Sequence, residues 1–225
     1  MDYGCLPFPS TDLAVAALRH ARDLEQPAVF NHSMRSYLYG RFIGAERGLR
    51  PDLDYDDELL FFGCVLHDTG LSGQRAGEQT FDIDGADHAV EFLGGLGVAP
   101  ERLEVVWDAI ALHLQPGIAS RKRPEIALVS AGAGFDLGPH GPYSLPAGYA
   151  DRVHALLPRL GGAAALYDAI VAQALEMPVK APPFTLPGEL LRQHTGQSWP
   201  TWRQLMDQPP SWNDYATRTA GPLAH

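Results

Sequence analysis

The sequence has few cysteines and no excess of basic residues. Its two cysteines, Cys5 and Cys64, are too few for a disulfide framework, and Cys64 stands in an apolar run where a buried free thiol is expected. Lys and Arg number 17 against 27 Asp and Glu, which gives a formal net charge of −10. We therefore expect neither nucleic acid nor an anionic membrane surface as a general partner.

Signals for export and membrane insertion are also missing. No apolar run approaches the roughly 18 residues that span a bilayer, and the N-terminus shows no basic region followed by an apolar stretch. A cytoplasmic protein is therefore expected. There is no convincing period-two alternation, repeat or linker, so the chain is expected to form a single all-α domain over 1–225.

Caps, prolines and glycines divide the chain into segments of helical length. Ser10 is expected to cap the first helix, Asp56 or Asp57 to open the third and Asp84 to cap the fourth. The expected helices cover about 10–25, 27–48, 56–68, 84–94, 100–113, 124–134 and 163–175. Loops are expected at 72–80 and 138–149. A C-terminal helix and an irregular tail, about 160–225, are expected to wrap the core.

The apolar run 59–66 ends on an adjacent polar pair, His67 and Asp68, which makes a poor core ending and a good pair of metal ligands. Other histidines and an aspartate follow or precede it at intervals of about one helix plus a connection: His32, His88, His113 and Asp136. Imidazole and carboxylate ligands without cysteine suit Zn²⁺, Fe²⁺ or Mn²⁺ and argue against a structural zinc site. The series predicts a metal site where the helices converge.

This ordered series resembles the HD-domain superfamily of metal-dependent enzymes, an all-α helical fold named after its His-Asp pair. Within about 28–140, five segments look like signature segments of the cyanamide hydratase-like branch: 30–37, 66–71, 81–86, 109–113 and 132–138. The resemblance implies four ligands for one metal ion, commonly zinc or iron: His32, His67, Asp68 and Asp136. Asp68 also counts among the catalytic residues.

His88 departs from that branch, in which a small residue is expected at this position. Together with His113 it restores the six-ligand set of binuclear HD proteins, and Asp68 is able to bridge to a second ion. Both histidines are therefore candidates either for a second metal ion or for groups that line the pocket. One or two ions are expected.

The resemblance and the metal chemistry together favour hydration of a small nitrile-type substrate by metal-activated water. A proton must reach the substrate nitrogen, and His113 and Asp84 are the nearest candidates, although a helix cap would explain Asp84 equally well. Arg35 lies one helical turn from His32 and is expected to orient the substrate. Asn31 is expected to donate a hydrogen bond to it.

Other functions fit the same residues. A phosphohydrolase acting on a nucleotide or phosphomonoester would need a phosphate clamp, for which Arg35 with Arg75 or the basic run 121–123 is available, although that run is more simply a solvated loop. Two irons would instead make an oxygenase, and a degenerate HD domain would serve only as a binding module. The leading expectation is a metal-dependent hydrolase or hydro-lyase with a small-molecule substrate, with homo-oligomerisation also considered.

Overall fold

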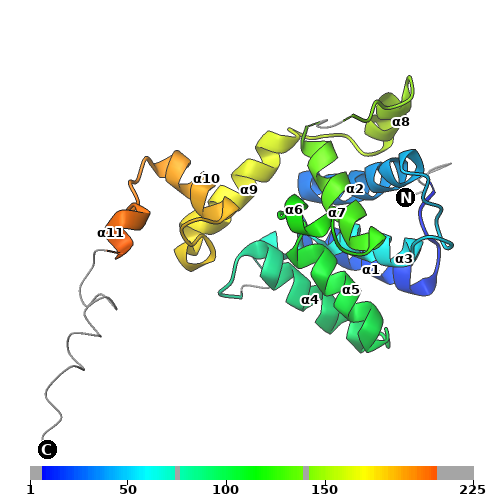
Figure 1. Ribbon diagram of the computed structural model, residues 1–225, viewed down its shortest axis with the longest axis horizontal. Helices are drawn as coiled ribbons and strands as arrows, with labels where there is room; N and C mark the ends of the chain where they lie inside the picture. Colours follow the sequence, from blue (N-terminus) through cyan, green and yellow to red (C-terminus); the bar gives the residue numbers. More distant parts are fainter. Residues whose placement is uncertain (1–6, 74–76, 139–141, 207–225) are drawn as a thin grey trace, which may run out of the picture. The chain divides into compact units, whose positions relative to one another are not determined.

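The computed structural model describes residues 7–73, 77–138 and 142–206, and the regular secondary structure in these ranges is helical, apart from an isolated bridge between Pro51 and Tyr55 (Figure 1). The all-α prediction is confirmed. Contacts divide the chain between Leu191 and Arg192 into two compact units. The single domain expected over 1–225 stays a prediction. No helix in the described ranges has the length and apolar character to cross a membrane.

The helices of the first unit follow one another through mostly short connections. Their bounds are α1 Asp12–Leu24, α2 Pro27–Glu46, α3 Asp57–Leu66, η1 Thr69–Leu71, α4 Phe81–Gly95, α5 Pro100–Ala111, α6 Pro116–Ala119, α7 Pro124–Leu137, α8 Tyr149–Leu156, α9 Ala163–Glu176, η2 Pro178–Lys180 and α10 Leu186–Thr195. The unit boundary falls inside α10. The described part of the second unit also contains α11, Trp202–Met206.

Local signals explain several helix starts. Asp56 caps α3, because its side chain accepts a hydrogen bond from the backbone N–H of Leu59 at 3.0 Å. Proline, which has the backbone φ of a helix and no N–H to satisfy, stands at the start of three expected helices: Pro27 in α2, Pro100 in α5 and Pro124 in α7. These starts lie where the sequence predicts them.

Two expected caps are wrong. The hydroxyl of Thr11, not Ser10, accepts the N–H of Ala14 at 3.1 Å and caps α1. Thr80 precedes α4, so Asp84 lies within its first turn rather than at its cap. The expectation of an irregular tail is also wrong as far as residue 206, because η2, α10 and α11 form there. The helices α6 and α8 were not expected. α8 is only eight residues long and buries only Val153.

α3 lies at the centre of the first unit, and all residues from Leu59 to Leu66 are buried. It packs against α1, α2, α5 and α7, which explains why the run has no polar face (Figure 1). Because the helix is surrounded, the pair that follows its last residue lies inside the protein. His67 and Asp68 are accordingly buried.

α2 and α7 approach closely through glycines. A Cβ on Gly132 would lie 2.1 Å from the carbonyl oxygen of Ser36, a distance that no side chain tolerates. Glycine therefore permits this contact between the two helices. The contact aligns α2 with α7 and places His32 beside Asp136, although 104 residues separate them in the sequence.

Candidate metal centre

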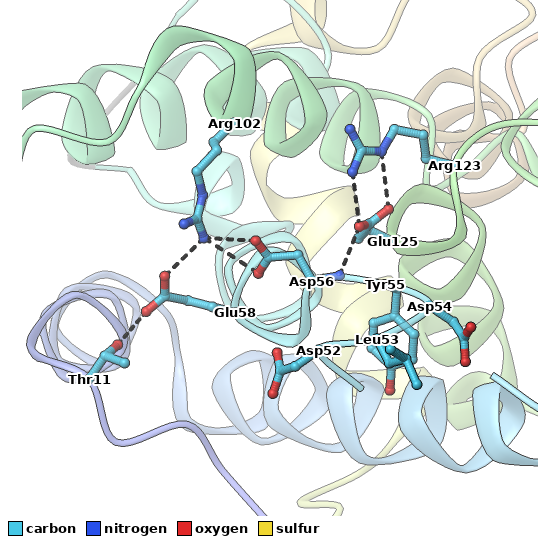
Figure 2. Close-up of a pocket in the computed structure, with 10 residues that line it drawn as sticks. All are labelled: Thr11, Asp52, Leu53, Asp54, Tyr55, Asp56, Glu58, Arg102, Arg123 and Glu125. Atoms are coloured by element: carbon cyan, nitrogen blue, oxygen red, sulfur yellow. Dashed lines mark hydrogen bonds and ion pairs between the residues drawn. The ribbon is translucent and has the colours of Figure 1, made fainter. Parts of the chain in front are cut away.

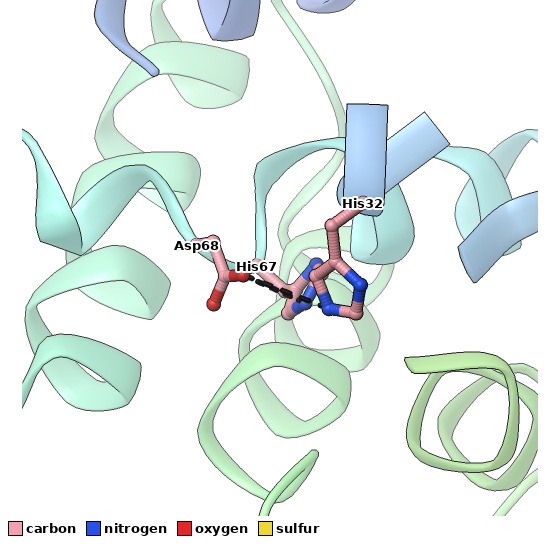
Figure 3. Close-up of side chains that lie close together, drawn as sticks. All are labelled: His32, His67 and Asp68. Atoms are coloured by element: carbon pink, nitrogen blue, oxygen red, sulfur yellow. Dashed lines mark ion pairs between the residues drawn. The ribbon is translucent and has the colours of Figure 1, made fainter. Parts of the chain in front are cut away.

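Three buried side chains from two helical segments form a group that fits a metal ion (Figure 3). His32 comes from α2, and His67 and Asp68 directly follow α3. Each offers one ligand atom, and the three atoms lie within 4.8 Å of one another. Asp68 Oδ2 is 3.3 Å from His67 Nε2 and 3.8 Å from His32 Nε2. Two imidazole nitrogens and a carboxylate oxygen suit zinc or iron.

The hydrogen bonding of the group supports this interpretation. His67 Nε2 and Asp68 Oδ2 are buried without a hydrogen-bond partner, an arrangement that costs stability unless a ligand satisfies the atoms. The other ring nitrogen of each histidine is held. His67 Nδ1 donates to the carbonyl of Cys64 at 2.7 Å, and His32 Nδ1 donates to Asp136 Oδ2 at 2.8 Å. These bonds select the tautomer that leaves Nε2 available to a metal.

Burial tunes the protonation of the group. It lowers the pKa of His67 to about 3, and the neighbouring His32 adds to the effect, so the His67 imidazole is neutral at neutral pH and able to bind a metal. The same burial raises the pKa of Asp68, against the opposing influence of His32 and His113. A bound cation would favour the ionised carboxylate and counter this cost.

Asp136 contacts His32 at Nδ1, away from the metal group, and is not one of the three residues that supply ligand atoms. Its two oxygens accept hydrogen bonds from Arg35, Oδ1 from Nε and Oδ2 from Nη2, both at 2.7 Å. Arg159 Nη1 adds a bond to Oδ1 at 3.2 Å. Burial alone would raise the pKa of Asp136, but the bonds from Arg35 and His32 hold it well below its usual value. In this structure the expected fourth ligand is an ionised carboxylate that orients His32.

Arg35 and Asn31 have partners within the protein in place of the expected substrate contacts. Arg35 is fully buried, and its Nη1 donates to the carbonyls of Leu157 and Pro158 at 3.1 and 3.2 Å. Asn31 Nδ2 donates to the same Pro158 carbonyl at 2.8 Å. With Nε and Nη2 bound to Asp136, every guanidinium nitrogen of Arg35 has a protein acceptor. The two side chains therefore tie the end of α8 to α2.

His113 lies beside the metal group. Its ring centroid is 4.8 Å from that of His67, and its Nδ1 donates to the carbonyl of Ile110 at 2.6 Å. Burial and the neighbouring His67 lower the pKa of His113 to about 4, so this ring is also neutral at neutral pH. His113 therefore neighbours the metal group, but it is not among the three side chains whose ligand atoms lie within 4.8 Å of one another.

His88 and Asp84 are engaged elsewhere. His88 Nε2 lies 2.7 Å from Nε2 of His20, which is partly buried. Asp84 Oδ2 lies 2.7 Å from Lys180 Nζ, and both side chains are buried. In the described parts of the chain, no second group of three His, Cys, Asp or Glu side chains has the spacing of a metal site.

A small cavity reaches Asp68. It measures about 80 Å³ and is lined by residues of the α1–α2 corner, of η1 and the segment after it, and of α9: Leu24, Glu25, Gln26, Val29, Asp68, Leu71, Ser72, Gly73 and Ala169. The lining contains two carboxyl groups, from Asp68 and Glu25, and no Lys or Arg. Sequence reasoning missed Glu25 and Arg159, because neither belongs to the His and Asp series. Only a carboxylate just before Pro27, at a helix junction, could have indicated Glu25.

A larger pocket of about 520 Å³ contains none of the predicted metal ligands or catalytic residues (Figure 2). Its charged side chains largely pair with one another. Arg102 Nη2 lies 3.2 Å from Asp56 and 2.9 Å from Glu58, and Arg123 Nη2 lies 3.2 Å from Glu125 (Figure 2). This pocket is therefore a weaker candidate for the functional site than the buried metal group.

Comparison with known proteins agrees with the buried group. Residues 29–156 match the family model described as the HD domain. The match covers more than half of the chain and includes the three ligand candidates and Asp136. It ends before α9, which contributes Ala169 to the cavity, and before Lys180, the partner of Asp84. No curated protein was found to match the chain.

Proposed function

Because the chain belongs to the HD domain family, which generally consists of metal-dependent hydrolases, we propose that it adds water to a small, neutral nitrile-type substrate, as cyanamide hydratases do. The observation that carries the proposal is the cavity at Asp68, which is small and has carboxyl groups but no cation in its lining. A hydratase or hydrolase of this kind acts on a small molecule, in keeping with the expected partner.

The metal would be held by His32 and His67 through Nε2 and by Asp68 through Oδ2. When bound, it would supply a water whose pKa is lowered to about 7 and polarise the atom under attack. The protein contributes the rest. Asp136 and the Cys64 carbonyl orient the two imidazoles. His113, neutral at neutral pH, would accept a proton from the attacking water and pass it to the nitrile nitrogen.

The size of the cavity supports a substrate of very few heavy atoms. Its volume of about 80 Å³ is well below the roughly 300–1,000 Å³ of pockets that hold drug-sized ligands. A molecule of three non-hydrogen atoms, such as cyanamide, matches this space, whereas a nucleotide does not. The apolar side chains in the lining, among them Val29 and Leu71, suit a neutral molecule.

The charges around the site favour hydration over phosphohydrolysis. Arg35 and Arg159 both bind Asp136, and Arg75 lies outside the described residues. The basic run also has protein partners: Arg121 donates to the Gly117 carbonyl, Lys122 Nζ lies 2.8 Å from Asp108, and Arg123 contacts Glu125. The lining of the cavity offers a phosphate dianion no Lys or Arg. A two-iron oxygenase would need a second ligand set, and His88 pairs with His20 instead.

The test uses the purified full-length protein, stripped with a chelator and reloaded with Zn²⁺, Fe²⁺ or Mn²⁺. We expect conversion of cyanamide to urea with at least one metal, and almost none in Asp68→Asn. Asp108→Asn is the matched control, because it alters an exposed aspartate paired with Lys122. Release of phosphate from a panel of nucleotides, without amide formation from any nitrile, would contradict the proposal.

A further inference from the structure

We infer that Glu25 is a specificity-determining residue, whose Oε2 accepts a hydrogen bond from an N–H group of the substrate. It would thereby select small N–H-bearing nitriles over molecules of the same size that carry a methyl group instead. The inference deepens the proposed function and relies on it for the location of the substrate. It is carried by the burial of the carboxyl group, its hydrogen bonding and the two cavities that Glu25 lines.

The corner between α1 and α2 fixes the position of Glu25. The residue caps the C-terminus of α1 in an extended conformation, with φ −87° and ψ 143°, and its N–H donates to the carbonyl of Ala21. Pro27 begins α2 two residues later. This turn directs the side chain of Glu25 inward, and only 8% of the residue is exposed. A carboxyl group at a helix end is normally solvated, so its burial requires an explanation.

Glu25 lines two cavities. One is the cavity of about 80 Å³ that also contains Asp68. The other measures about 290 Å³ and is lined largely by apolar side chains, including Phe30, Leu156 and Leu157. Glu25 therefore lines both the space next to Asp68 and a larger, mostly apolar pocket.

One oxygen of Glu25 has no partner. The hydroxyl of Ser33 lies 3.3 Å from Oε1 and 3.1 Å from the carbonyl oxygen of Val29, so it can bond to both acceptors. Oε2 is buried and makes no hydrogen bond. Buried polar atoms are nearly always satisfied in folded proteins, and an unsatisfied one is explained most simply by a missing ligand. Oε2 is the second unsatisfied carboxylate oxygen of the cavity, after Asp68 Oδ2.

Oε2 is able to accept a hydrogen bond in both protonation states of Glu25. Burial raises the pKa of this carboxyl, and the nearby Asp68 raises it further, against the bond from Ser33. If the group is protonated, Oε1–H can donate to Ser33 Oγ while the serine hydroxyl donates to Val29, and Oε2 is then a carbonyl oxygen. If it is ionised, Oε2 is a carboxylate oxygen. The ligand must therefore supply a donor, such as an amino N–H.

Cyanamide and acetonitrile are a matched pair of probes, because they differ only by NH₂ in place of CH₃. Their dissociation constants are measured by ligand-observed NMR on the full-length, metal-loaded protein, and their turnover is followed separately. We expect the natural protein to bind cyanamide roughly tenfold or more tightly than acetonitrile, as sites that hydrogen-bond a substrate group discriminate against analogues without it. This preference is expected to vanish in Glu25→Leu and to persist in part in Glu25→Gln, which keeps an acceptor oxygen.

Asp23→Asn is the control, because Asp23 is an exposed carboxylate near the same end of α1 that lines neither cavity, and it is expected to leave the preference unchanged. Glu25→Met provides a second apolar variant, and circular dichroism verifies that each protein is folded. An equal preference in Glu25→Leu and the natural protein, or no preference in the natural protein, would overturn the inference. A preference that depends on Glu25 without turnover of either nitrile would support the inference and contradict the proposed hydration.

Discussion

His32 Nδ1 lies 2.8 Å from Asp136 Oδ2, and this bond connects the metal group to the packing of α2 on α7. Asp136 is in turn held by Arg35, which lies one turn from His32 on α2. The orientation of a candidate ligand thus depends on a buried carboxylate from a helix far away in the sequence. Metal affinity and helix packing are therefore expected to respond together to changes in this region.

Replacing Asp136 by Asn is expected to weaken zinc binding by about 10- to 100-fold, because the charge that orients His32 and pairs with Arg35 is lost. His67→Ala, which removes a ligand atom, is expected to weaken it much further. Competition with a chromophoric chelator measures both affinities, with Asp108→Asn as the surface control. Equal losses in the two variants would instead make Asp136 a direct ligand, and unchanged affinity in Asp136→Asn would contradict the orienting role.

Gly132→Ala is expected to lower the free energy of unfolding by at least about 2 kcal/mol, because its Cβ would lie 2.1 Å from the Ser36 carbonyl oxygen. It is also expected to weaken metal binding by displacing α2. Gly134→Ala is the matched control in the same helix, since no atom lies within 4 Å of its Cβ. Helix propensity predicts a gain of up to about 1 kcal/mol there. Urea unfolding of the metal-free proteins separates the two outcomes, and equal effects would show that the helices do not pack as described.

The buried pair of Lys180 and Asp84 joins η2 to α4. η2 lies outside the segment that matches the HD domain, and α4 lies inside it. Lys180→Met leaves the Asp84 carboxylate buried without its partner, and we expect a loss of about 3–5 kcal/mol of stability. The double variant Lys180→Met, Asp84→Leu is expected to regain most of it. Arg50→Met, which breaks an exposed ion pair with Asp54, is expected to have no measurable effect. A loss in the double variant as large as in the single one would contradict the coupling.

The metal-free protein is expected to lose stability as the pH falls below about 6.5. The pKa of His113 is lowered to about 4 in the folded state, so the unfolded chain binds the proton first. This contribution is fully present above pH 6.5 and disappears as the pH falls toward 4. His113→Gln removes it, and we expect the variant to lose about 2–3 kcal/mol less than the natural protein between pH 7 and pH 4. Identical pH profiles by chemical denaturation would rule out a neutral, buried His113.

The sequence predicts the helices and the metal group better than it predicts the contacts around them. Proline starts, the Asp56 cap and the continuous apolar run of α3 are local signals, and they place His67 and Asp68 at a buried helix end. Thr11 rather than Ser10 caps α1, and α4 begins three residues before Asp84, so helix starts read from local signals are displaced by a few residues. The short helices after residue 176 bury few side chains, so they leave little pattern to read.

By itself, the sequence determined the helical fold, because helix periodicity and caps depend on residues close together in the chain. It also proposed His32, His67, Asp68 and Asp136 as ligands, through the ordered series that resembles the HD family. Only the tertiary structure decided what the other candidates do. It placed Asp136 behind His32, bound Arg35 to Asp136, paired His88 with His20 and turned Glu25 toward the cavity at Asp68. These relationships depend on how closely distant helices approach, which the Gly132 contact between α2 and α7 sets and which no local pattern encodes.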